Sequence, residues 1–198
     1  MTDGDSWAVV LWVRLWHWLT ALLFLILSLT GVYLHFAPRG SASGYALANS
    51  LHDLAGIALA ATYLAYVAGA LTTGHWRHFV PDRRGLGQRL RREVAIYLRA
   101  GDPAEVADRF KPLQQLTYLL VVYALLPLLI LSGLLYRYYP AVPVVAPEEV
   151  LGLGGLWPLA SVHYLLAIPG IAFLIVHIYM GAFAPGSRAM LKRMIIGR

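Results

Sequence analysis

Apolar residues fill four long stretches of the chain, residues 15–38, 54–76, 112–136 and 150–187, in which no charged side chain occurs. Each is at least as long as the roughly 20 apolar residues that a helix needs to cross a bilayer. The first is also too long for the apolar core of a cleaved signal peptide. The pattern predicts an all-α integral membrane protein, a single four-helix bundle with spans over about 11–36, 51–73, 113–136 and 159–184.

Polar and helix-breaking residues mark the expected ends of these spans. The run SLHD at residues 50–53 predicts a capping box at the start of the second span, with Ser50 as the N-cap and Asp53 at the third helical position. Proline suits the first turn of a helix, so Pro112 indicates where the third span begins. Residues 88–100 place apolar side chains at helical spacing among arginines, which is typical of an amphipathic helix on an anionic membrane surface.

Positive charge is concentrated on one side of the expected bundle. Of the 16 Lys and Arg residues, nine lie between the second and third spans, four lie in the C-terminal tail, and Arg14 lies at the start of the first span. The other two connections contain one cation each, Arg39 and Arg137. Because cytoplasmic loops carry the excess of Lys and Arg, we expect both termini and the middle loop to be cytoplasmic. This topology accounts for the net charge of +6, and we expect no nucleic acid partner.

The chain contains no cysteine. This excludes disulfides, iron–sulfur ligation by thiolates, thiolate zinc sites and the covalent attachment of a c-type haem. Histidine, with seven copies, is the main transition-metal ligand that remains.

Two histidines of the fourth predicted span lie on one face of the helix. His163 and His177 are 14 residues apart, which at about 100° per residue is close to four full turns. The rise between them is about 21 Å, so one histidine lies near each side of the membrane. Since the fourth span runs inward, His163 is the outer residue and His177 is the inner one.

Histidines of two other spans lie at the same two depths. His17 is level with His177 in the cytoplasmic half of the first span, and His52 is level with His163 at the outer start of the second. Two imidazoles can bind one haem iron, whereas structural zinc takes four ligands. The matched depths therefore predict two b-type haems, one held by each pair. A lone membrane histidine is more often a hydrogen-bonded core residue, but that interpretation leaves the matched depths without a cause.

Residues near these depths are candidates for supporting roles. Gly31 lies 14 residues after His17 on the same face, where the absence of a side chain leaves room for a macrocycle or for a close helix contact. Arg14, nearly one turn before His17, can pair with a propionate of the inner haem or anchor the topology. His35 competes with His52 as an outer ligand, because it too lies on the face of His17.

Two further histidines, His75 and His78, lie at the inner end of the second span. We expect them to be interfacial, with proton delivery to a quinone as the alternative role.

Several runs resemble the helices of a known family. They are VRLWHW at 13–18 with LTG at 29–31, LHDLAG at 51–56, PLQQLTY at 112–118 with SG at 132–133, and His163 with HIYM at 177–180. These runs resemble the bacterial dihaem b-type cytochrome subunits of formate dehydrogenases, nickel–iron hydrogenases and thiosulfate or polysulfide reductases. The run AML at 189–191 is most similar to the formate dehydrogenase and thiosulfate reductase branch.

The resemblance implies the same ligand pairing that the depths predict. It also implies a quinone site beside the cytoplasmic haem, near the start of the third span, where Gln114 matches the family's glutamine. Many members have asparagine where this chain has Lys111, which can still donate a hydrogen bond to a quinone oxygen.

We therefore predict an electron-transfer subunit of the bacterial inner membrane that anchors a redox complex. Electrons would pass between the quinone pool and a periplasmic or membrane-bound partner, which the resemblance implies to be an iron–sulfur, molybdenum, hydrogenase or multihaem cytochrome subunit. The long apolar connection over 137–157 offers the docking surface that an anchor needs. The alternatives are a free-standing quinol-oxidising cytochrome b and a haem-free transporter that moves protons or ions through its histidines.

Overall fold

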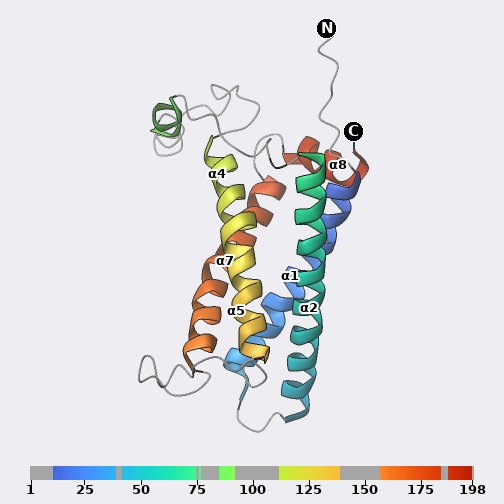
Figure 1. Ribbon diagram of the computed structural model, residues 1–198, viewed down its shortest axis with the longest axis vertical. Coiled ribbons are helices and arrows are strands. Elements are labelled where there is room, and N and C mark those ends of the chain that lie inside the picture. Colours follow the sequence, from blue (N-terminus) through green and yellow to red (C-terminus); the bar gives the residue numbers. More distant parts are fainter. Residues whose placement is uncertain are drawn as a thin grey trace. The chain divides into compact units, whose positions relative to one another are not determined.

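The computed structural model describes residues 11–38, 42–74, 76, 85–91, 112–138, 157–183 and 187–197. Its main helices are α1 (Leu11–Phe36), α2 (Ala42–Thr73), α4 (Pro112–Leu120), the π-helix η3 (Val121–Leu125), α5 (Leu126–Tyr138), α7 (Trp157–Phe183) and α8 (Ser187–Ile196) (Figure 1). No strand occurs in this part of the chain.

Four helical segments are long and apolar enough to cross a membrane, namely Leu11–Phe36, Ala42–Thr73, Gln115–Tyr138 and Pro158–Phe183. The prediction of an all-α membrane protein with four spans is thereby confirmed. The predicted first span coincides with α1, and the predicted fourth span differs from α7 by at most two residues at either end.

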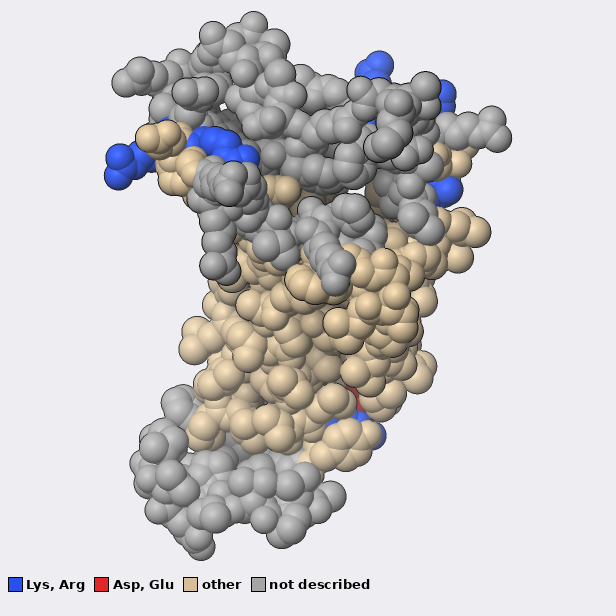
Figure 2. Space-filling view, turned by 45° about the horizontal axis from the view of Figure 1, so that its top comes forward, with Lys and Arg blue, Asp and Glu red and all other residues tan. Residues whose placement is uncertain are grey.

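Large apolar side chains cover the outside of these helices. Leu64 of α2 and Ile175 of α7, for example, are 68% and 64% exposed. Figure 2 shows a broad field of uncharged atoms, with Lys and Arg drawn only near its ends. Exposed apolar area of this extent suits contact with lipid tails rather than with water.

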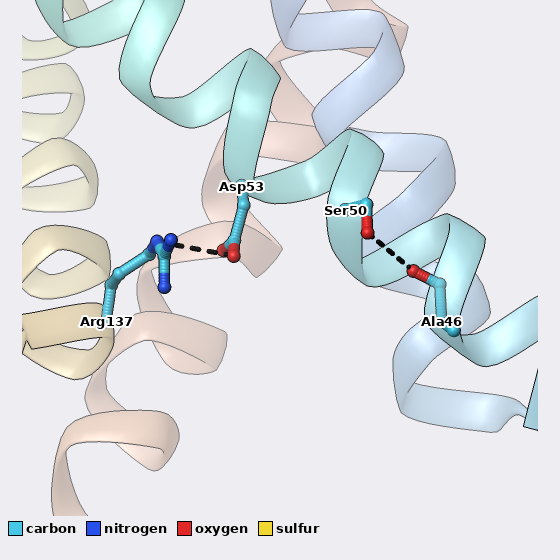
Figure 3. Close-up of polar contacts among 4 residues, drawn as sticks. All are labelled: Ala46, Ser50, Asp53 and Arg137. Carbon is cyan, nitrogen blue, oxygen red and sulfur yellow. Dashed lines mark hydrogen bonds and ion pairs between the residues drawn. The ribbon is translucent and has the colours of Figure 1, made fainter.

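The second span begins earlier than the sequence predicted. α2 starts at Ala42, so Ser50 lies inside the helix, and its hydroxyl donates a hydrogen bond to the carbonyl of Ala46 at 2.9 Å (Figure 3). The prediction that the helix opens at Ser50 with a capping box is therefore wrong. The physical reason is that alanine is the strongest helix former and that a serine hydroxyl can bond the carbonyl four residues earlier, so nothing stops the helix at Ser50.

The third span contains a π-helical segment that the sequence pattern did not reveal. Within η3 the N–H of Leu126 donates to the carbonyl of Val121. Pro127 follows directly, and a proline in a regular α-helix lacks its N–H and clashes with the carbonyl of the residue four positions earlier, here Tyr123. The wider π turn accommodates the proline without ending the span.

The chain divides into two compact units. One contains α1, α2 up to Val67, α5 from Leu129, α7 and α8. The other contains the end of α2, α4, η3 and the beginning of α5. The four histidines predicted as haem ligands all belong to the first of these units.

Small residues and aromatic rings bring the helices of the first unit together. A Cβ atom built at Gly170 of α7 would lie 3.1 Å from Phe24 of α1 and 3.5 Å from Leu129 of α5. Trp16 of α1 stacks on Tyr66 of α2, with ring centroids 3.9 Å apart. Such close packing fixes the rotation of each helix about its axis, and with it the direction of every side chain.

The C-terminal segment forms a helix, α8, where the sequence indicated only a basic tail. Arg14 of α1 donates hydrogen bonds to the carbonyls of Met194, from Nε at 3.3 Å, and Ile195, and Trp18 Nε1 donates to Met194 at 3.0 Å. Carbonyls in the last turn of a helix have no partner within the helix, and a cation there also complements the helix dipole. Residues of α1 therefore cap the C-terminal end of α8.

We expect the substitution Gly170→Leu to destabilise the protein by about 1–3 kcal/mol, because the new side chain would overlap Phe24 and Leu129. The measurement is the thermal unfolding midpoint in detergent, followed by tryptophan fluorescence. Gly181→Leu is the matched control on the same helix, since no atom lies within 4 Å of a Cβ built there. Equal midpoints for the two variants would contradict this description of the packing.

Candidate functional site

Histidines from different helices face each other at two positions along α7. His52 of α2 lies across from His163, with ring centroids 6.2 Å apart and ring planes at 83°. His17 of α1 lies across from His177, at 6.0 Å and 55°. We name these the outer pair and the inner pair after their predicted depths. They are the pairs that the sequence predicted, and all four rings are partly buried.

The separation of the rings leaves room for one metal ion in each pair. An imidazole nitrogen binds a first-row metal at about 2 Å and the ring centre lies about 1 Å farther out, so two imidazoles on opposite sides of one ion have centres about 6 Å apart. Both measured separations match this value. Two opposed ligands are what a haem iron takes when the porphyrin fills its other positions. Among the described residues, no cluster of three or more His, Cys, Asp or Glu side chains offers another metal site.

Hydroxyl groups on neighbouring helices contact both imidazoles of the outer pair. Thr30 Oγ1 of α1 lies 2.9 Å from His52 Nδ1, and Ser132 Oγ of α5 lies 2.9 Å from His163 Nδ1. Neither hydroxyl was among the predicted site residues. The sequence does contain a pattern that could have indicated them: a hydroxyl residue followed by glycine occurs at both places, as Thr30-Gly31 and as Ser132-Gly133.

The hydrogen bonds of these hydroxyls determine which imidazole nitrogen carries the proton. A hydroxyl has one proton, which Thr30 donates to the carbonyl of Ile26 at 2.7 Å and Ser132 donates to that of Leu129 at 3.1 Å. With its proton on that carbonyl, each hydroxyl can accept a hydrogen bond from Nδ1–H of its histidine. In a neutral imidazole this leaves Nε2 with a free lone pair, the form that binds a metal. The outer pair thus fits a haem iron.

Glycines provide the space in which the outer imidazoles lie. A Cβ atom at Gly31 would be 3.3 Å from Cε1 of His52, and one at Gly133 would be 3.1 Å from Cε1 of His163. The sequence predicted that Gly31 makes room for a macrocycle or a close helix contact, and in the structure this room is filled by the edge of an imidazole. Gly133, which has the same role opposite His163, was not predicted.

Three polar atoms near the inner pair are buried without a partner among the described residues. They are Nδ1 of His17, Nε1 of Trp16 and Oγ1 of Thr20, all within about one turn of α1. A buried polar group without a hydrogen bond costs about 1–3 kcal/mol, so three in one turn call for a further polar group. A bound haem, whose propionates can accept hydrogen bonds from Trp16 Nε1 and Thr20 Oγ1, fits this arrangement. On the other side, Phe173 packs against His177 with ring centroids 5.3 Å apart.

Two other predicted candidates have different contacts. His35 stacks on Tyr164, with ring centroids 4.1 Å apart and planes at 9°, while His52 occupies the place opposite His163. Arg14 donates to the end of α8, as described above. A guanidinium has five N–H donors, so its propionate contact stays a prediction.

The predicted quinone residues are described only in part. Gln114 lies in the first turn of α4, without a described side chain, and Lys111 lies outside the described residues. His75 and His78 also lie outside them.

The outer pair lies beside an ion pair that joins two helices. Asp53, the residue after His52, pairs with Arg137 of α5 at 3.3 Å between Oδ2 and Nε (Figure 3). Both side chains are partly exposed, so the pair contributes at most about 1 kcal/mol to stability. It links α2 and α5 at the end where the outer pair lies.

The sequence as a whole matches one protein family. The model of the prokaryotic cytochrome b561 family matches residues 9–197. The chain is 34% identical over 192 residues to an Escherichia coli (strain K12) protein that carries the name cytochrome YdhU, and the match covers 93% of this chain and 71% of that protein. No solved structure matches the chain. The chain therefore belongs to the prokaryotic cytochrome b561 family and is a multi-pass b-type cytochrome of the bacterial inner membrane that takes part in electron transfer.

Proposed function

We propose that this cytochrome holds two haems and passes electrons between the quinone pool and a redox partner on the periplasmic side, which it also anchors to the membrane. The inner pair would hold one b-type haem and the outer pair the other. The observation that carries this proposal is the arrangement along α7. This one helix presents two histidines 14 residues apart, and each faces an imidazole of another helix across a gap of one metal ion.

The protein contributes the ligands, their orientation and an apolar surrounding. Haem, when bound, supplies the reversible one-electron chemistry of its iron. The helices hold the imidazoles of the outer pair by packing and hydrogen bonds and those of the inner pair by packing, and they keep bulk water away from the ligand atoms. The two histidines of α7 are about 21 Å apart along the helix, in a hydrocarbon core of about 30 Å. Redox groups at these two depths would together span most of the thickness of the hydrocarbon core.

The described cations support a cytoplasmic position for the inner pair. Arg14, three residues before His17, holds the end of α8, and α8 exposes Arg188, Lys192 and Arg193. An excess of cations beside a span marks its cytoplasmic end. In this orientation both termini are cytoplasmic and the outer pair is close to the periplasm.

The quinone would bind near the first turn of α4. Gln114 lies in that turn, and its amide can donate a hydrogen bond to a quinone oxygen. Lys111, one residue before the helix, offers a second donor and a route for protons from the cytoplasm. The likeness of PLQQLTY at 112–118 to the dihaem subunits supports this assignment.

The partner would be an iron–sulfur, molybdenum, hydrogenase or multihaem cytochrome subunit. Membership of a cytochrome family disfavours a haem-free transporter. A free-standing quinol-oxidising cytochrome is the alternative, and it differs from the proposal only in having no partner.

We expect two b haems per chain in a pyridine haemochrome assay and a reduced-minus-oxidised spectrum. His163→Ala should remove the outer haem and His17→Ala the inner one, because each haem then loses one of two iron ligands. His35→Ala is the control and should retain both, since His35 stacks on Tyr164. A colourless protein after expression with ample haem precursors would refute the proposed function.

Replacing Gln114 by leucine should raise the KM for quinol about three- to tenfold in stopped-flow haem reduction, because one hydrogen bond to the quinone is lost. Gln115→Leu is the matched control on the same turn. A quinone site at Gln114 would be contradicted if both substitutions changed the KM equally, or if neither changed it.

A tagged chain purified from its native membrane in mild detergent should retain its redox partner at a stoichiometric ratio. The readouts are mass spectrometry of the purified material and reduction of the haems by the partner's substrate. Purification of the cytochrome alone, with quinol oxidation intact, would instead establish the free-standing alternative.

A further inference from the structure

The two halves of the outer pair are built in the same way. In each, a helix carries a hydroxyl residue followed by glycine, and the next span along the chain carries a histidine. Thr30-Gly31 of α1 receives His52 of α2, and Ser132-Gly133 of α5 receives His163 of α7. The glycine leaves room for the edge of the ring, and the hydroxyl can accept a hydrogen bond from Nδ1–H. Both imidazoles therefore have the same kind of hydrogen-bond acceptor.

The inner pair does not share this arrangement at His17. Its Nδ1 is buried and has no hydrogen-bond partner among the described residues. The nearby hydroxyl, Oγ1 of Thr20, is likewise unpartnered there and makes no bond to the ring. The outer pair therefore has two imidazoles with hydroxyl acceptors, while the inner pair has at least one without.

We propose that Thr30 and Ser132 are positioning residues that selectively lower the midpoint potential of the outer haem by accepting hydrogen bonds from the Nδ1–H groups of His52 and His163. This inference rests on the proposed function, since it presumes that both pairs hold haem. An imidazole whose N–H is donated to an acceptor is a stronger base, and a stronger ligand favours ferric over ferrous iron. The shift favours electron transfer from the outer haem to the inner one, and thus from the periplasmic side toward the cytoplasmic side.

The test is a redox titration of the purified cytochrome, monitored by the absorbance of the two b haems. Each component is assigned with the variants His17→Ala and His163→Ala. At a fixed ambient potential, Thr30→Val and Ser132→Ala should each raise the ferrous-to-ferric ratio of the outer haem about fivefold, since a neutral hydrogen bond contributes about 1 kcal/mol. At about 59 mV per tenfold change for one electron, this is a rise of about 41 mV for each hydroxyl. The inner haem should keep its potential.

Two controls separate the hydrogen bond from packing. Ser28→Ala removes a hydroxyl of α1 that donates to the carbonyl of Phe24 at 2.8 Å, as Thr30 does to Ile26, but the bonds of Ser28 reach no histidine. It should leave both potentials unchanged. Thr30→Ser keeps the acceptor and should keep the potential of the outer haem.

The possible outcomes distinguish this inference from the proposed function. If the unaltered protein contains no haem, the proposed function fails. If it contains two haems and the Thr30→Val/Ser132→Ala double variant leaves both potentials unchanged, or shifts both equally, the inference is overturned and the function stands. If Thr30→Val loses the outer haem, restoration by Thr30→Ser supports the positioning role, and failure of Thr30→Ser to restore it overturns that role.

Discussion

The structure depends on one geometric constraint, the distance between imidazoles of different helices. α7 carries both His163 and His177, and each must meet a second ring across about 6 Å for one metal ion to bind between them. The partners come from α2 and α1, two consecutive helices that run in opposite directions (Figure 1). A rotation of any of these helices by one residue, about 100°, would break a pair. The packing at Gly170 and between Trp16 and Tyr66 holds those rotations.

The outer and inner histidine pairs have similar ring separations but different neighbouring residues. The outer imidazoles have hydroxyl acceptors, close-fitting glycines and an ion pair between Asp53 and Arg137 nearby. Around His17, three buried polar atoms have no described partner. Such atoms are costly in an apolar interior, and a bound group could satisfy those of Trp16 and Thr20. If both pairs hold haem, as proposed, the different surroundings of their imidazoles would separate the two midpoint potentials.

The sequence-based errors concern features that local signals leave undecided. The run SLHD matches a capping box, yet the alanines before it continue the helix, because a serine hydroxyl can bond the carbonyl four residues earlier as well as cap an N-terminus. Pro127 could have ended or kinked the third span, and a π turn absorbed it. The helix α8 was not predicted, because the cations of the C-terminal segment were attributed only to the membrane topology. Its C-terminal carbonyls are capped by Arg14 and Trp18, about 180 residues away in sequence.

The sequence by itself determined the class of the protein, its four spans and the two depths at which histidines can meet, because charge-free length and the regular rise of a helix fix position along the membrane normal. It could not choose between His35 and His52 on physical grounds, since that choice depends on how helices rotate and pack. Only the tertiary structure decided that His35 stacks on Tyr164, and that Thr30 and Ser132 form hydrogen bonds with the imidazoles of the outer pair. The depth of a histidine in the membrane follows from the sequence of one helix, whereas its contacts depend on how two helices pack.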